Sequence, residues 1–179
     1  MHNDATRIRW IVSDVDGVWT DGKIIYMGDT REVKEFNVRD GLAVKIAQKA
    51  GLQIGVITSR RSQALERRCS ELGITTLIQS AANKLFEMQR LAEHHKITLD
   101  EILYVGDDLP DLAPIHAAGI SAAPADAAPE VLAAASWRLT SRGGQGAFRE
   151  LVERLLRNRG DWERIVQDFH VAKINTSNV

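Results

Sequence analysis

The sequence predicts an α/β protein with a doubly wound, Rossmann-like parallel sheet between layers of helices. Short apolar runs typical of buried strands alternate with segments of helical periodicity through most of the chain. Glycine follows several of the helical segments, at the position where it commonly ends a helix. The length of 179 residues suits one domain with its own core, so we expect residues 1–179 to form a single domain.

The alternation places each expected element in order along the chain. Strands are predicted over residues 8–13, 52–57, 74–78 and 102–105, and helices over residues 41–50, 62–72, 83–95 and 112–118. Connections of this kind are right-handed crossovers between parallel strands, which gives the doubly wound arrangement. Two further helices are expected over 147–157 and 162–169, followed by a mobile tail over about 170–179.

One segment departs from the alternation. The β-prone runs at 23–27 and 31–36 flank Gly28, Asp29 and Thr30, which predicts a β-hairpin inserted over about residues 21–37. This insert is too small to form a domain.

Composition and charge exclude several classes of protein. The 23 lysines and arginines nearly balance the 24 aspartates and glutamates, giving a net charge of −1, so we expect neither a nucleic acid nor an anionic membrane as partner. No apolar run approaches the roughly 18 residues that cross a bilayer. The single cysteine, Cys69, excludes an intrachain disulfide framework and falls in a helical pattern where burial is expected. The first residues lack a secretory signal pattern, so we expect a cytoplasmic protein.

Acidic residues follow two of the predicted strands. Asp14 and Asp16 come after the first strand, and Asp107 and Asp108 follow the strand at 102–105, with Asp111 one helical turn further on. Ligands of doubly wound sheets bind beyond the carboxyl ends of the strands. Like charges gathered there require a cation, and an oxygen-only ligand set favours Mg²⁺.

The spacing of the first pair suits phosphoryl transfer. Asp14 and Asp16 can both approach one reacting centre, the first as nucleophile and the second as proton donor. Gly17 permits a sharp turn, which would free the main-chain carbonyl of Asp16 to reach the metal. Because the attack of a carboxylate on a phosphate ester brings two anions together, Mg²⁺ and Lys84 would neutralise charge, and the Thr58 hydroxyl would hold a phosphoryl oxygen.

Each signal has an ordinary structural interpretation when it is taken alone. Asp-x-Asp can be a turn device, Thr58 an N-cap and Lys84 a solvated helix residue. Asp40 could pair with Arg39 across the mouth of the site or cap the helix that follows. The joint occurrence of four elements at strand ends and helix starts favours a metal-dependent phosphotransfer site.

The same segments resemble known motifs. Asp14-Val-Asp-Gly-Val18, Val56-Ile-Thr-Ser59, Asn83-Lys84 and Gly106-Asp-Asp-Leu-Pro-Asp111 resemble, in order and approximate spacing, the four motifs of the haloacid dehalogenase-like phosphatases. Over roughly residues 9–156, with Phe36-Asn-Val-Arg-Asp-Gly41 and Arg142-Gly-Gly-Gln-Gly-Ala147, the chain is similar to the branch that hydrolyses 3-deoxy-D-manno-octulosonate 8-phosphate (KDO 8-phosphate) in lipopolysaccharide synthesis.

The resemblance implies roles for individual residues. Asp14 would become an aspartyl-phosphate, and Asp16 would act first as acid and then as base. Mg²⁺ would be held by Asp14, the Asp16 carbonyl and Asp107, with Asp108 and Asp111 behind them. The expected substrate contacts are Thr58, Ser59, Arg60, Lys84 and Arg142, of which Arg60 and Arg142 are candidates for a sugar-acid carboxylate. For Arg142, a solvated loop position is the alternative; the glycines beside it suggest a mobile closing segment.

The resemblance also implies a fold without a cap domain and a homotetramer whose neighbouring subunits complete each site. Two positions depart from the usual pattern: Ser59 replaces a glycine, and Trp19 replaces a smaller aliphatic residue and is expected to place bulk near the site entrance.

Three alternatives to the KDO 8-phosphate reaction remain. They are the hydrolysis of another sugar-acid phosphate, such as a nine-carbon 9-phosphate, a receiver-like phospho-switch, and an inactive scaffold. Against the switch stands Asp16, whose acid–base chemistry would turn the acyl phosphate over quickly. An inactive scaffold would normally lack one of Asp14, Asp16, Lys84 or Asp107.

Overall fold

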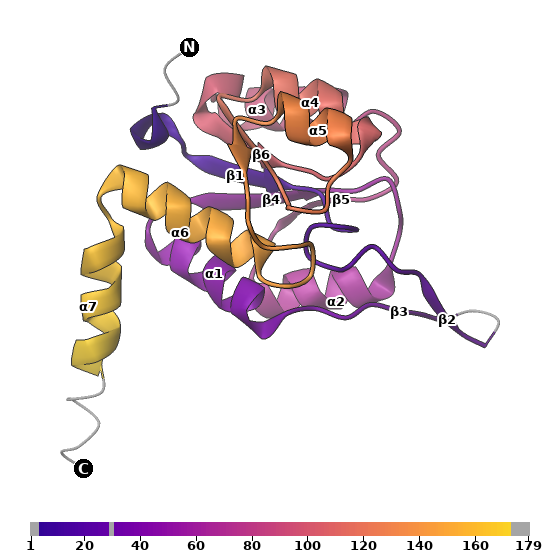
Figure 1. Ribbon diagram of the computed structural model, residues 1–179, viewed down its shortest axis with the longest axis horizontal. Helices are drawn as coiled ribbons and strands as arrows, with labels where there is room; N and C mark the ends of the chain where they lie inside the picture. The colour runs from indigo at the N-terminus through magenta and orange to yellow at the C-terminus, as the bar shows by residue number, and fades with distance from the viewer. Residues whose placement is uncertain (1–3, 29–30, 173–179) are drawn as a thin grey trace.

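A six-stranded parallel sheet forms the centre of the computed structural model, which describes residues 4–28 and 31–172 (Figure 1). The strand order is β5-β4-β1-β6-β7-β8. The strands are β1 Trp10–Ser13, β4 Gln53–Ile57, β5 Thr76–Ile78, β6 Ile102–Val105, β7 Ile120–Ala123 and β8 Trp137–Arg138. Helices cover both faces of this sheet, which confirms the predicted doubly wound class.

The order of the strands fixes where a site can form. From the central β1 the chain adds β4 and β5 on one side, then crosses back to add β6, β7 and β8 on the other. Val12 of β1 pairs with Gly55 of β4 and with Tyr104 of β6. The crossovers therefore diverge beside β1, and the carboxyl ends of β1 and β6 lie at the position where doubly wound sheets bind ligands.

Two apolar clusters, one on each face of the sheet, form the core. Ile11 points into the first cluster and Val12 into the second, as the period of two in a strand requires. The first cluster is covered by α1 Val38–Lys49, α2 Gln63–Leu72 and α6 Ala147–Arg159, with α7 Trp162–Ala172 packed on α6. The second is covered by α3 Lys84–His95, α4 Leu112–Ala117 and α5 Pro129–Ala134. Three short 3₁₀ turns complete the described elements: η1 Ala5–Arg7, η2 Leu99–Glu101 and η3 Leu109–Asp111.

The predicted hairpin is present and projects from the body of the molecule (Figure 1). Its strands, β2 Ile25–Met27 and β3 Arg31–Val33, pair antiparallel. Ile24, Ile25, Tyr26 and Met27 are exposed along it. The hairpin therefore presents apolar side chains to solvent.

Several boundaries differ from the predictions. Helix α1 begins at Val38 rather than near Gly41, because the Asn37 side chain accepts the Arg39 N–H. Strand β7, helix α5 and strand β8 were not predicted. Residues 170–172 belong to α7 rather than to a tail, and the remainder of the expected tail lies outside the described residues. Within the described part of the chain, no helix has the length and hydropathy needed to cross a bilayer.

Both interpretations of Asp40 were wrong. Asn37, not Asp40, caps α1, and Arg39 is exposed. Asp40 is buried inside α1 and accepts the backbone N–H of Arg149 in the first turn of α6 at 2.8 Å. It joins two helices rather than two sides of a pocket.

Candidate active site

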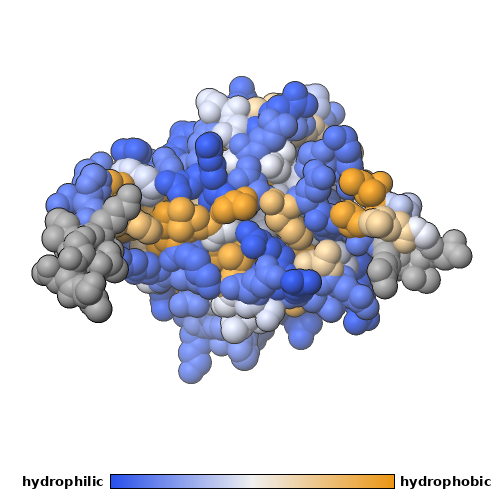
Figure 2. Space-filling view, turned by 90° about the horizontal axis from the view of Figure 1, so that it is seen from below, coloured by the Kyte–Doolittle hydropathy of each residue, from blue (hydrophilic) through white to orange (hydrophobic). Residues whose placement is uncertain are grey.

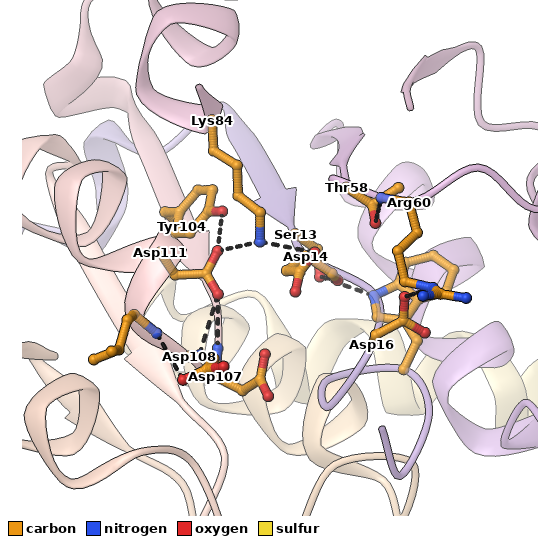
Figure 3. A network of polar contacts seen from close by, with 12 residues as sticks. Ser13, Asp14, Asp16, Thr58, Arg60, Lys84, Tyr104, Asp107, Asp108 and Asp111 are labelled. Carbon is orange, nitrogen blue, oxygen red and sulfur yellow. Dashed lines mark hydrogen bonds and ion pairs between the residues drawn. The ribbon is translucent and has the colours of Figure 1, made fainter. Parts of the chain in front are cut away.

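A pocket of about 280 Å³ opens at the carboxyl ends of β1, β4 and β6. It contains most of the predicted site residues, although they come from separate parts of the chain (Figure 3). The lining residues are Asp14, Asp16, Gly22, Thr58, Ser59, Arg60, Lys84, Asp107, Asp108, Pro110 and Asp111.

The turn after β1 is shaped by a close approach. Gly17 has a φ of +84°, and a Cβ at this position would lie 1.9 Å from Oδ2 of Asp107. Only glycine therefore permits both this backbone conformation and the position of the Asp107 carboxylate against the loop. The glycine that follows the Asp-x-Asp pair brings the ends of β1 and β6 together.

Lys84 connects the two acidic segments. Lys84 is the first residue of α3. Its Nζ lies 3.0 Å from Oδ1 of Asp14 and 2.7 Å from Oδ1 of Asp111 (Figure 3). Asp111 is fully buried and also accepts the Tyr104 hydroxyl at 2.6 Å and the backbone N–H groups of Asp107 and Asp108. Its carboxylate thus holds Lys84 and shapes the turn after β6 at the same time.

Three carboxylates converge in this region, and Lys84 alone does not neutralise their combined negative charge. Oxygens of Asp14, Asp107 and Asp111 lie within 4.8 Å of one another. Burial, reinforced by Asp111 and opposed by Lys84, raises the pKa of Asp14 to about 6. Burial, together with the charges of Asp14 and Asp111, raises the pKa of Asp107 to about 8. A divalent cation bound among these oxygens would stabilise the ionised carboxylates, and carboxylate oxygens are the ligands that such hard cations prefer.

The segment after β4 supplies the hydroxyl of Thr58 and the guanidinium group of Arg60 to the pocket. Thr58 is buried, and its Oγ1 accepts the N–H of Arg60 at 3.3 Å, while Ser59 is exposed at the pocket wall. On the β6 side, Asp108 is exposed and caps η3 through the N–H of Leu109.

The hairpin contributes residues that the sequence analysis did not identify. Lys34, whose side chain is only 2% exposed, forms an ion pair with Asp16 Oδ1, and its Nζ lies 3.1 Å from Glu32 Oε1. Glu32 Oε2 accepts a hydrogen bond from Arg60 at 2.6 Å. Glu32 lies in β3 and Lys34 directly follows it, and this spacing of two residues, which puts side chains on one face of an extended chain, is the only signal in the sequence that could have paired them.

The structure does not bring Arg142 into the pocket. Its side chain is exposed, and its Nε lies 3.2 Å from Asp126 Oδ2. The neighbouring glycines also have another role than mobility: a Cβ on Gly143 would lie 2.0 Å from the carbonyl oxygen of Gly17, and the Gly144 N–H donates to Val18. Close packing on the first loop is what requires glycine here.

Trp19 does not lie at the site entrance as expected. It is 2% exposed in the core, its ring is 5.1 Å from that of Phe148, and its Nε1 donates to Ser13 Oγ at 2.9 Å. Ser13 Oγ in turn donates to the main-chain carbonyl of Asp14 at 2.5 Å. The indole of Trp19 therefore helps to hold the backbone of Asp14 in place through the Ser13 hydroxyl.

Comparisons with known proteins agree with this geometry. A family model described as haloacid dehalogenase-like hydrolase matches residues 68–151. The 3-deoxy-D-manno-octulosonate 8-phosphate phosphatase KdsC of Escherichia coli K12 is 41% identical over 157 residues, 87% of this chain and 83% of that protein. The Haemophilus influenzae KdsC is 36% identical over 160 residues, 89% of each chain.

A solved structure of the corresponding Moraxella catarrhalis phosphatase, in complex with magnesium, phosphate and KDO, superposes with a TM-score of 0.90 at 34% identity. The match covers 93% of this chain and 95% of that one. The sheet and its carboxylate-lined pocket are those of a haloacid dehalogenase-like phosphatase. Within that class, the chain belongs to the family of the KDO 8-phosphate phosphatases.

Proposed function

We propose that this enzyme hydrolyses KDO 8-phosphate to KDO and inorganic phosphate, with residues 1–179 acting as one catalytic domain. The observation that carries the proposal is the position of Asp14, which lines the pocket while Lys84 and two further carboxylates surround it. The names of the relatives at 36–41% identity support the choice of substrate.

The residues present fit a magnesium ion. Asp14 and Asp107 offer carboxylate oxygens, Gly17 leaves the space into which Asp107 extends, and Asp16 would add its main-chain carbonyl. When bound, Mg²⁺ neutralises the negative charge that gathers on the phosphoryl group and the carboxylates. The magnesium in the Moraxella catarrhalis structure supports this choice of ion.

The chain's own residues would carry the two chemical steps. An oxygen of Asp14 attacks phosphorus, the bond between phosphorus and the sugar oxygen breaks, and Asp16 gives that oxygen a proton. Asp16 then takes a proton from water as the water attacks the aspartyl-phosphate, which releases phosphate and restores Asp14. Lys84 and the Thr58 hydroxyl would hold the phosphoryl oxygens, and Asp111 would keep Lys84 in place.

The far end of the pocket would select the sugar acid. Arg60 offers a planar guanidinium that suits a carboxylate, and it lies beside Asp16 on the side of Asp14 away from Lys84 (Figure 3). Ser59, at the wall of the same pocket, would adjust the fit. A nine-carbon sugar-acid 9-phosphate carries the same two anionic groups and is the competing substrate.

The proposal includes a homotetramer and a cytoplasmic location. The exposed apolar residues of the hairpin, seen beside its grey tip in Figure 2, support contacts with other copies of the chain that would help close each site. A buried free thiol, Cys69, and a substrate that cannot cross membranes unaided because both its phosphate and its carboxylate are charged support the cytoplasm.

A panel of phosphorylated sugars tests the function. Phosphate release should be fastest with KDO 8-phosphate and should disappear when EDTA removes the metal. Preference for a nine-carbon acid 9-phosphate would support the competing substrate, and preference for a sugar without a carboxylate would contradict both. A phosphorylated protein that persists for minutes would instead support the receiver-like switch.

A further inference from the structure

We propose that Glu32 of the hairpin occupies the carboxylate site of the enzyme in the absence of substrate, and that the sugar-acid carboxylate displaces it from Arg60. This inference rests on the proposed function, because it assigns a carboxylate to the substrate. It makes Glu32 a specificity-determining residue that acts by competition.

The geometry is that of a carboxylate ligand already in place. Glu32 Oε2 lies 2.6 Å from a terminal nitrogen of Arg60, and Glu32 Oε1 lies 3.1 Å from Nζ of Lys34. Burial opposes the ionised form of Glu32, but hydrogen bonds from Arg60 and Lys34 outweigh it and lower the pKa of its carboxyl group. Glu32 thus engages the two cations at this end of the site as an anion.

Arg60 has capacity for a second acceptor. Its side chain is 38% exposed and lines the pocket, so an incoming carboxylate can reach it. Its Nε is buried without a hydrogen-bond partner among the described residues and lies 3.8 Å from Asp16 Oδ2. A guanidinium prefers a carboxylate that accepts two parallel hydrogen bonds, whereas Glu32 accepts one.

Glu32 can leave without disruption of the fold. It lies on a two-stranded hairpin whose ladder contains three residue pairs, and an isolated hairpin of this size is marginally stable. Lys34 also pairs with Asp16, so it keeps a partner when Glu32 moves away. Displacement therefore costs the two ion pairs of Glu32, with Arg60 and with Lys34, but the buried Lys34 stays neutralised by Asp16.

The competition predicts a specific effect of Glu32→Gln. The amide retains the shape but loses the charge, so a sugar-acid carboxylate should bind Arg60 about five-fold more tightly, the upper range for such a pair. A phosphate ester without a carboxylate does not compete with Glu32. The ratio of kcat/KM for KDO 8-phosphate to kcat/KM for p-nitrophenyl phosphate should therefore rise about five-fold.

The matched control is Glu35→Gln, which removes the same charge from an exposed position on the same hairpin. It should leave the ratio unchanged. Arg60→Met should abolish the preference for the sugar acid, and it should do so equally in the Glu32→Gln background. A ratio that stays constant or falls in Glu32→Gln, with an unchanged unfolding midpoint, would overturn the inference.

A second measurement separates this inference from the proposed function. Free KDO is used as a competitive inhibitor of p-nitrophenyl phosphate hydrolysis, and its inhibition constant should fall about five-fold in Glu32→Gln. Wild-type protein that ignores KDO 8-phosphate contradicts the proposed substrate, whereas an inhibition constant that is equal in wild type and variant contradicts the competition. Glu32→Ala repeats the test if the glutamine variant folds poorly.

Discussion

Asp107 is the residue at which the charge balance of the site is most easily measured. Its pKa is raised to about 8 because burial and the charges of Asp14 and Asp111 disfavour its ionised form. We expect Asp107→Asn to raise the unfolding midpoint of the metal-free protein near pH 8, since one repelling charge is removed. In wild type, magnesium at 100 times its dissociation constant should add about 2.7 kcal/mol of stability.

Thermal unfolding of EDTA-treated protein, with and without added magnesium, measures both effects. Asp100→Asn is the control, because Asp100 is exposed in η2 and does not line the pocket. A full magnesium response in Asp107→Asn would contradict its proposed role as a ligand.

Trp19 and Ser13 should be energetically coupled. Trp19→Phe retains the aromatic contact with Phe148 but removes the hydrogen bond to Ser13 Oγ, and Ser13→Ala removes its acceptor. A double-mutant cycle in urea should give a coupling of about 1 kcal/mol. Additive single effects would mean that the indole contributes packing alone.

The roles of residues could be predicted where a chemically reactive side chain directly follows a predicted strand or begins a predicted helix. Asp14, Lys84, Asp107 and Asp111 follow strands or start helices, so a parallel sheet necessarily gathers them at one edge. The ion pairs of Glu32 and Lys34 could not be predicted, because they depend on where the base of the hairpin lies relative to the loops after β1 and β4. The direction of Trp19 depends equally on tertiary packing.

At the scale of elements, Asp40 makes the contact between α1 and α6 sensitive to pH. Burial raises its pKa to about 6 from an ordinary value of 3.8, although the N–H groups of Arg149 and Gly146 oppose the shift. A raised folded-state pKa gives a stabilising contribution that is complete below 3.8 and is lost as the pH rises through 6. The free energy of unfolding should therefore lose about 2 kcal/mol from this group between pH 4 and pH 7.

Asp40→Asn removes this titration. The difference in unfolding free energy between variant and wild type should shift in favour of the variant as the pH rises from 4 to 7. Glu163→Gln, on the exposed side of α7, should show a nearly constant difference over that range. A constant difference for Asp40→Asn as well would refute the assignment.

Elements were predicted well where apolar and polar residues alternate with a clear period. The region from β7 to β8 was missed because it is rich in alanine, which fits helices and buried strands alike. Strand β7, Ile120–Ala123, is buried on both faces, so its sequence shows no alternation. Its neighbours α5 and β8 are too short to show a period.

At the scale of the whole molecule, the hairpin should determine assembly. Tyr26 and Met27 are 70% and 62% exposed, which is unusual for large apolar side chains on a strand. We expect wild type to sediment as a tetramer, near four times 19.9 kDa, and Ile25→Lys/Met27→Lys to give a smaller species. Loss of assembly should also reduce activity if neighbouring subunits close the site.

Val38→Lys is the control for this experiment. Val38 is 81% exposed at the start of α1, outside the hairpin, so its replacement should leave the sedimentation unchanged. A monomeric wild type would remove the hairpin from any role in assembly.

The contact of Gly143 and Gly144 with the loop that carries Asp16 joins two segments that lie far apart in the sequence. Strand β1 is translated first, yet both its partners in the sheet and the turn that packs on its loop are translated later. A ribosome-bound chain that stops before Gly143 thus holds the reactive aspartates without the turn that packs on their loop. Catalytic competence should appear abruptly, once Gly143 and Gly144 have been translated and can pack on this loop, rather than grow with the length of the nascent chain.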